Sequence, residues 1–236
     1  MSLVDTSWLE NNIDKVKIID CSWHMPQTKR NGFDEYKIKH IPGSIFFDLD
    51  LNSKKNTELP HMLVEIDNWK KIVSKMGIKN SDEIIIYDNS DVISSCRCWF
   101  NFIYFGHNPK LVHILNGGLN KWIAENRKTT TELSNIELSN YTCLEKKELV
   151  KTKNLIDQNI KDQKFKVIDA RSKERFEGKV PEPRKGLKSG NIKNSFCIPF
   201  NECLNTNKTF KKKEDLQIIF KSCLGNINEK NIVFSC

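Results

Sequence analysis

The chain has 236 residues, which is long enough for one large domain or for two domains of about 100–150 residues each. Its 38% hydrophobic and 29% charged residues are typical of a soluble globular protein. No apolar run approaches the ~20 residues that span a bilayer, and the N-terminus lacks the basic and apolar stretches of a secretory signal. These features argue against a membrane-bound chain, and the cytoplasm is the expected compartment.

The formal net charge is +8, and the lysines that produce it are scattered along the chain among acidic residues. No basic helix and no alternation of basic with aromatic residues stands out, so nucleic acid is not an expected partner. A positive field would still raise the local concentration of small anionic substrates.

The eight cysteines are irregularly spaced and no secretory signal accompanies them, which favours reduced thiols over a disulfide framework. Cys96 and Cys98 form a C-x-C pair without the second cysteine or histidine pair that a zinc site needs. We therefore predict that both cysteines belong to a helix and are packing residues. Neither a metal nor an organic cofactor is expected.

In chain order, the first half alternates strands and helices. Short apolar runs predict buried strands, and apolar residues at positions i, i+3, i+4 and i+7 predict an amphipathic helix. Strands are expected at residues 16–20, 45–48, 84–88 and 110–115, and helices at residues 69–76, 94–105 and 119–125.

The second half begins after a stretch rich in Thr, Ser and Asn, which predicts a linker. We expect an N-terminal domain at 1–127, the linker at 128–144 and a C-terminal domain at 145–236. In the C-terminal domain, strands are expected at 165–169, 196–200 and 232–236, and helices at 145–160 and 216–223.

The two halves repeat one another. Asp20 and Asp169 each end the opening strand, and 68 residues separate Asp20 from Asp88 against 67 between Asp169 and Cys236. Four consecutive elements agree in this way. The sequence therefore predicts an α/β fold built from two tandem copies, each with a mainly parallel central sheet flanked by helices.

Cys236 takes the place in the second copy that Asp88 takes in the first. A thiol in one copy and a carboxylate in the other indicate one active site and one inactive site. A thiolate at a strand end is stabilised by main-chain N–H groups of the following loop and helix. Because the second copy lacks its last helix, strand and helix, we expect it to be incomplete at its C-terminus and the natural protein to continue beyond Cys236.

Three segments resemble the two-domain rhodanese family of sulfurtransferases: residues 40–44 (His-Ile-Pro-Gly-Ser), 115–122 (Leu-Asn-Gly-Gly-Leu-Asn-Lys-Trp) and 181–186 (Pro-Glu-Pro-Arg-Lys-Gly). The resemblance covers essentially the whole chain. It implies an inactive N-terminal copy and a catalytic C-terminal copy whose nucleophile is Cys236.

Within that family, Arg184 and the segment at residues 59–63 (Leu-Pro-His-Met-Leu) resemble the 3-mercaptopyruvate sulfurtransferases, because thiosulfate-using members usually lack this arginine. Asn191 is a departure, since the family commonly has His there. A second departure is that Cys236 is the first of six loop residues that select the donor, and the other five are absent from this sequence.

The resemblance also implies roles for four further side chains. Arg175 and Arg184 would bind the carboxylate and carbonyl oxygen of 3-mercaptopyruvate, a task that suits the planar guanidinium group. Asp50 and His61 would assist proton transfer. Two alternatives stay open: the arginines are solvated residues of a loop between strands, or the Asp50–His61 pair is a hydrogen bond that only fixes the two domains relative to one another.

Five other polar residues are expected to be structural. Asp20 and Asp169 would bond to the backbone or to arginine, and Arg171 would form an ion pair. His40 would cap or bond within its turn, and Arg97 would pair with a carboxylate at the domain interface.

The implied function is transfer of sulfur from 3-mercaptopyruvate, through a persulfide on Cys236, to thioredoxin, glutathione or cyanide, with release of pyruvate. A thiosulfate sulfurtransferase with the same persulfide is the nearest alternative. A non-catalytic sulfur carrier or binding module with an inert Cys236 is another, and a phosphate-handling relative with a cysteine in an anion-binding loop is a third. The sequence leaves the donor preference, the acceptor and the oligomeric state open.

Overall fold

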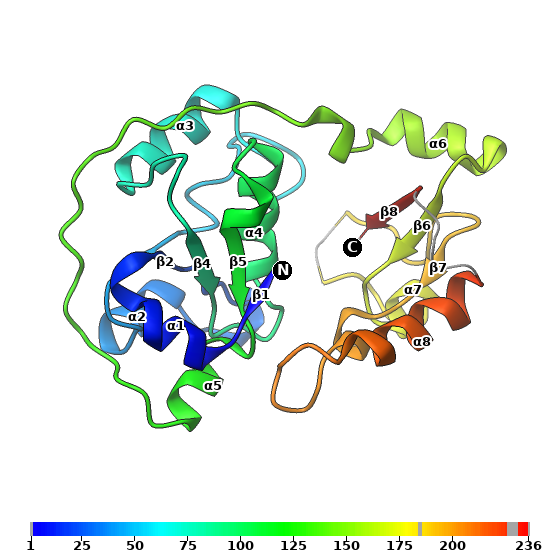
Figure 1. The fold of residues 1–236 in the computed structure, drawn as a ribbon. Coiled ribbons are helices and arrows are strands. Elements are labelled where there is room, and N and C mark those ends of the chain that lie inside the picture. Colours follow the sequence, from blue (N-terminus) through cyan, green and yellow to red (C-terminus); the bar gives the residue numbers. More distant parts are fainter. Residues whose placement is uncertain (1, 184–185, 226–230, 236) are drawn as a thin grey trace. The chain divides into compact units, whose positions relative to one another are not determined.

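The computed structural model describes residues 2–183, 186–225 and 231–235, and it divides into two compact units, Met1–Leu149 and Val150–Cys236 (Figure 1). Each unit is an α/β structure around a parallel sheet. The division falls later in the chain than the predicted boundaries of 127 and 144.

The predicted linker is part of the first unit rather than a free connection. Thr130 and His40 exchange main-chain hydrogen bonds of 2.9 and 3.0 Å, and Leu144 donates its N–H to Phe105 O at 3.0 Å. Tyr141 is fully buried in the core of the first unit. Burial of this aromatic ring, worth about 2 kcal/mol or more, holds the segment against the unit.

The first unit has five parallel strands in the order β1-β5-β4-β2-β3. They are β1 (Leu3–Val4), β2 (Lys17–Asp20), β3 (Ser44–Phe46), β4 (Ile84–Tyr87) and β5 (Val112–Leu115). The helices are α1 (Thr6–Asn12), α2 (Gly32–Ile38), α3 (Ile66–Lys75), α4 (Ser95–Tyr104) and α5 (Gly118–Ala124).

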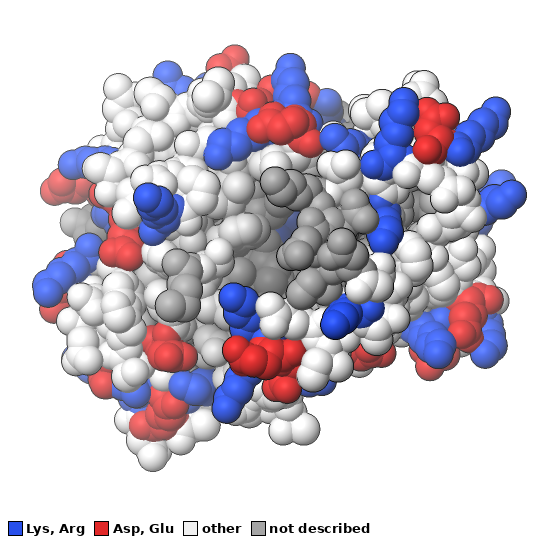
Figure 2. Space-filling model, turned by 45° about the vertical axis from the view of Figure 1, so that its right-hand side comes forward, with Lys and Arg blue, Asp and Glu red and all other residues white. Residues whose placement is uncertain are grey.

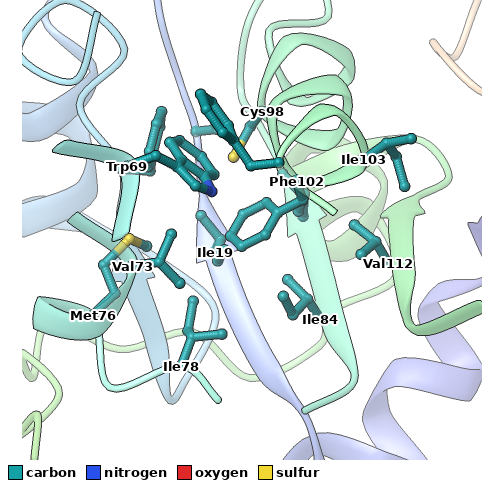
Figure 3. Packing of buried hydrophobic residues seen from close by; sticks show 14 of the residues in the cluster. Ile19, Trp69, Val73, Met76, Ile78, Ile84, Cys98, Phe102, Ile103 and Val112 are labelled. Carbon is teal, nitrogen blue, oxygen red and sulfur yellow. The ribbon is translucent and has the colours of Figure 1, made fainter. Parts of the chain in front are cut away.

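Alternation along the strands gives this sheet two buried faces. Ile19, Ile84 and Ile86 pack with residues of α3 and α4 in one core, which Figure 3 shows from close by. Ile18 and Ile85 pack on the other face with residues of α1 and α5. Strands buried on both faces are nearly continuous apolar runs, which is why the sequence revealed them.

The second unit has three parallel strands in the order β7-β6-β8. They are β6 (Lys166–Asp169), β7 (Phe196–Cys197) and β8 (Ile232–Ser235), and the helices are α6 (Lys153–Asp162), α7 (Lys173–Phe176) and α8 (Lys213–Leu224). Its small core is formed by Ile168, Ile198 and Leu224 with partly buried neighbours.

The expected strands and the helices along 69–76, 94–105, 119–125 and 216–223 are all present, with ends that differ by a few residues. The helix expected at 145–160 is wrong at its start: a 3₁₀ turn, Lys147–Leu149, comes first and α6 begins at Lys153. Thr152 sets that start, because its side chain accepts a hydrogen bond from the N–H of Leu155. The segment with Arg175, expected as a loop, contains the short helix α7.

The order β3-β2-β4 in the first unit matches the order β7-β6-β8 in the second. Asp20 pairs in register with Tyr87 of β4, and Asp169 pairs with Ser235 of β8. The residue after each aspartate donates its N–H to that same partner, at 2.9 Å in the first unit and 2.8 Å in the second. The position after Tyr87 in the first unit therefore corresponds to the position after Ser235 in the second.

No helix in the described ranges is long and apolar enough to cross a membrane. On the face drawn in Figure 2, Lys and Arg side chains are dispersed, with Asp and Glu among them. The view agrees with the scattering of lysines along the sequence.

Candidate active site

Two of the predicted site residues, Cys236 and Arg184, lie outside the described residues. The chain places Cys236 directly after β8, whose last residue, Ser235, is paired with Asp169. The other three, Asp50, His61 and Arg175, are described.

Asp88 shows how the first unit holds an anion at the position that corresponds to Cys236. Its Oδ1 accepts the N–H of Ser90 at 2.9 Å, and its Oδ2 accepts the N–H of Ser95 at 2.8 Å. Ser95 is the first residue of α4, so the carboxylate lies at the N-terminus of a helix. Main-chain N–H groups and the helix dipole both stabilise a negative charge there.

Asp50 and His61 form the predicted pair. His61 Nε2 lies 2.7 Å from Asp50 Oδ1. Because an ionised carboxylate only accepts hydrogen bonds, Nε2 is the nitrogen that carries the proton, which leaves Nδ1 as the acceptor of neutral imidazole. The Asp50 side chain is 68% exposed and that of His61 is 17% exposed, so hydrogen bonds rather than close packing orient the carboxylate.

Two residues that sequence reasoning did not connect with this pair also contact it. Trp23 Nε1 donates to Asp50 Oδ2 at 2.9 Å, and its ring meets that of His61 edge to face at a centroid distance of 4.8 Å. Arg97, expected to pair with a carboxylate, donates from Nη2 to the main-chain oxygen of His61 at 2.5 Å. A tryptophan three residues after the strand-ending Asp20 was the available signal for the first contact.

Arg175, in α7, is held by an acid of the segment that follows this helix. Its Nη2 lies 2.5 Å from Glu182 Oε2, and Arg171 Nη1 lies 2.7 Å from Glu182 Oε1. Hydrogen bonding to Arg175 holds the pKa of Glu182 below its usual range. Arg171 also grips Asp169, which confirms the prediction that it forms a structural ion pair. The carboxylate between the two guanidinium groups fixes the side chain of Arg175 in place.

Cys96 and Cys98 lie in α4, as predicted. Cys98 is fully buried, and burial raises the pKa of Cys96 to about 12. The Cys96 thiol is therefore protonated near neutral pH, and a thiol in that state is a poor nucleophile. Among residues 2–183, 186–225 and 231–235, no cluster of three His, Cys, Asp or Glu side chains could hold a metal ion.

The remaining structural predictions concern His40 and Asp20. His40 is fully buried and bonds through its ring to the main-chain oxygens of Tyr36 and Glu132, at 2.6 and 3.0 Å. It therefore bonds within its turn, as expected, and also to the segment that was expected to be a linker. Asp20 accepts the N–H of Ser22 at 2.9 Å, as predicted for a structural aspartate.

The family model of the rhodanese-like domain matches residues 5–125 of this chain. Thiosulfate/3-mercaptopyruvate sulfurtransferase 2 of Arabidopsis thaliana is 35% identical over 242 residues, which cover 93% of this chain and 70% of that protein. The mitochondrial sulfurtransferase 1 of the same plant is 36% identical, and the matched region is 62% of its length. The 3-mercaptopyruvate sulfurtransferase of Mus musculus is 31% identical over the whole of this chain and 81% of its own length.

Among solved structures, SseA from Escherichia coli, described as a 3-mercaptopyruvate sulfotransferase with the rhodanese fold, has a TM-score of 0.87 and 28% identity. The similarity covers 100% of this chain and 88% of SseA. Its extent agrees with the parallel sheets flanked by helices found in both units. The chain belongs to the rhodanese family of sulfurtransferases.

Proposed function

We propose that this protein transfers sulfur from 3-mercaptopyruvate to a thiol acceptor through a persulfide on Cys236. The observation that carries the proposal is the correspondence between β4 and β8. In the first unit the residue after β4 is an anion held by main-chain N–H groups, and in the second the residue after β8 is a cysteine. Relatives named for sulfur transfer from 3-mercaptopyruvate support the choice of donor.

The proposed reaction has two steps. The Cys236 thiolate attacks the sulfur of 3-mercaptopyruvate, an S–S bond forms and the C–S bond breaks. The electron pair of that bond leaves with the carbon as the enolate of pyruvate, which then takes up a proton. In the second step an acceptor thiolate attacks the outer sulfur of the persulfide and regenerates the Cys236 thiolate.

The proposal gives the other residues these tasks. Arg175 and Arg184 bind the carboxylate end of the donor, and His61 with Asp50 handles the proton that the enolate needs. Support for Arg175 comes from its fixed side chain: Nε and Nη2 bind Glu182, and Nη1 makes no hydrogen bond within the described part of the chain. The N–H groups of Nη1 are placed to donate a hydrogen bond to one oxygen of an anionic sulfur donor.

The compartment and the acceptor belong to the proposal as well. Thioredoxin, glutathione and cyanide are the acceptors we propose, since each supplies a nucleophile for the outer sulfur. We propose the cytoplasm as the compartment, and we note that one Arabidopsis relative is mitochondrial.

The test is the mass of the protein after exposure to 3-mercaptopyruvate. We expect a gain of one sulfur atom that peptide mapping assigns to Cys236, that a reducing thiol removes and that the Cys236→Ser variant lacks. Sulfur on another cysteine, or the same gain in the serine variant, would refute the proposal.

A thiosulfate sulfurtransferase is the second candidate, favoured by a Rattus norvegicus relative of that name with 32% identity over 93% of this chain. Turnover with the two donors at equal concentration separates the candidates. We expect 3-mercaptopyruvate to be the better donor by at least about tenfold, and a reversed preference would select the alternative. Loading of Cys236 without any transfer to an acceptor would indicate a sulfur carrier instead.

A further inference from the structure

The segment after β4 in the first unit, residues 88–94, is called here the Asp88 loop. In the second unit the corresponding segment begins at Cys236, so the first unit has the loop without the thiol. Its shape is fixed by Asp88, which accepts the N–H groups of Ser90 and Ser95. The Asp88 loop carries no nucleophile, but these two hydrogen bonds fix its conformation.

The Asp88 loop holds the main chain of Trp23 on both sides. Ser90 Oγ donates to Trp23 O at 2.5 Å, and the N–H of Trp23 donates to Ser94 Oγ at 3.1 Å. Ser94 Oγ in turn donates to Cys21 O at 2.6 Å. Two serine hydroxyls of the loop thus fix the segment that follows β2, 67 to 73 residues away in the sequence.

Trp23, fixed in this way, contacts both members of the His61–Asp50 pair. Its indole N–H donates a hydrogen bond to Oδ2 of Asp50, and His61 Nε2 is hydrogen-bonded to Oδ1 of the same carboxylate. Because most of the Asp50 side chain is exposed, these two donors define its orientation. The edge of the indole ring also lies against the imidazole ring.

The helix that follows the loop holds His61 from another direction. Arg97, in the first turn of α4, donates to the main-chain oxygen of His61. His61 has φ = 57°, in the left-handed region that non-glycine residues rarely adopt. A residue in that conformation persists when its surroundings fix it, and the Arg97 hydrogen bond is one such constraint.

We infer that the Asp88 loop and the start of α4 position the His61–Asp50 pair, with Trp23 and Arg97 as the positioning residues. The loop that would carry a nucleophile in a working copy serves in the first unit as a support for another part of the chemistry. The inference deepens the proposed function, because it rests on proton transfer by His61, but its hydrogen-bond chain lies wholly within the first unit.

The first test is Trp23→Phe, which keeps a ring and removes the indole N–H. Trp99→Phe is the matched control, since Trp99 Nε1 donates to Val112 O at 3.2 Å, away from the pair. The readout is the ¹⁵N NMR spectrum of the His61 ring, assigned with a His61→Gln variant. We expect the ratio of the Nε2–H to the Nδ1–H tautomer to fall about fivefold in Trp23→Phe and to stay unchanged in the control. An unchanged ratio in Trp23→Phe would overturn the inference.

The second test asks whether the loop acts through Trp23. Ser90→Ala removes the hydroxyl that donates to Trp23 O, and Ser139→Ala removes an equally short hydroxyl bond, to Ile78 O at 2.5 Å, elsewhere in the first unit. Both variants should melt at similar temperatures, but only Ser90→Ala should change the His61 tautomer ratio. In a Trp23→Phe background, Ser90→Ala should add little further change. An equal effect of both serine variants would reduce the loop to a general stabilising element and contradict the inference.

Kinetics separate this inference from the proposed function. If His61 transfers the proton, Trp23→Phe should lower kcat about tenfold and leave KM for 3-mercaptopyruvate within twofold, while Trp99→Phe changes neither. If the unmodified protein fails to load sulfur on Cys236, the proposed function fails, and the NMR tests still decide the positioning.

Discussion

Asp169 and Arg171 form a bidentate ion pair in the second unit. Arg171 Nε lies 3.0 Å from Asp169 Oδ1, and Arg171 Nη2 lies 2.5 Å from Asp169 Oδ2. In the first unit Ser22 stands two residues after Asp20, as Arg171 stands two residues after Asp169, and it brings no charge. Asp20 is 1% exposed, and burial raises its pKa to about 6. The two units therefore keep corresponding carboxyl groups in different electrostatic surroundings.

The raised pKa of Asp20 makes a prediction about stability and pH. A carboxyl group whose pKa is higher in the folded than in the unfolded protein stabilises the fold at low pH, and this contribution is lost as the pH rises through the folded value, about 6. Asp20→Asn removes the titration. We expect the free energy of unfolding of Asp20→Asn, relative to the parent, to rise by about 2 kcal/mol between about pH 4.5 and about pH 7.5. Urea titrations at the two pH values measure it, and a constant difference would contradict the prediction.

Gly32 provides a steric prediction. It is the first residue of α2, where alanine would favour the helix by ~1 kcal/mol, but a Cβ atom there would lie 2.0 Å from the main-chain oxygen of Ser22. The clash with backbone outweighs the helix preference, so Gly32→Ala should destabilise the first unit by about 2–4 kcal/mol. Gly43→Ala is the comparison: nothing lies within 4 Å of its Cβ, and its φ of +76° should cost only about 1 kcal/mol. Equal melting temperatures for the two variants would show that the segment around Ser22 can move.

The sequence predicted those parts of the fold that depend on runs of apolar residues. Strands β2, β4, β6 and β8 are short apolar segments, and each was located within one or two residues. The helix α2 was missed, because its start depends on Asn31, whose side chain accepts the N–H of Asp34, rather than on an apolar stripe. The segment 128–144 was misread for a related reason: its polar composition conceals Tyr141, whose burial ties the segment to the first unit.

For the site, the family resemblance brought Asp50 and His61 together before the structure did. It could not supply their supports. The hydrogen bond from Ser90 to Trp23 joins residues 67 apart, and a serine hydroxyl bonded to a main-chain oxygen leaves no periodic or compositional pattern. Contacts of this kind depend on the packing of β2 beside β4, which only the folded chain defines.

Glu182 makes a prediction about the second unit. Its side chain is 3% exposed and accepts hydrogen bonds from Arg171 and Arg175, and the bond from Arg175 lowers its pKa. A lowered pKa means that the acid contributes stability above its unfolded value, near 4.5, and loses it as the pH falls through the folded value. Glu182→Gln should therefore destabilise the second unit by about 2 kcal/mol near pH 7 and by less at a pH below the folded value.

The control for this variant is Glu177→Gln. Glu177 pairs with Lys179, whose side chain is 70% exposed, so its loss should cost little at either pH. Thermal melts of both variants across the pH range test the difference. If the loss in Glu182→Gln persisted unchanged at low pH, the two guanidinium groups would not be the reason for its stabilising role.

Asp88 tests the anion-binding character of the position that corresponds to Cys236. Both of its carboxylate oxygens accept main-chain N–H groups, from Ser90 and Ser95, and the side chain of asparagine has only one oxygen. Asp88→Asn should therefore turn an amide N–H₂ group towards one of these donors and remove the charge at the start of α4. We expect a loss of about 1–3 kcal/mol in the free energy of unfolding, largest at low ionic strength, where the interaction with the helix dipole is least screened.

Amide hydrogen exchange should show the loss at Ser90 and Ser95 first, because these are the N–H groups left without a full partner. If exchange at those two positions stayed slow while the rest of the unit loosened, the carboxylate would be a general packing element. The geometry of an anion cradle would then be the wrong guide to the cysteine after β8.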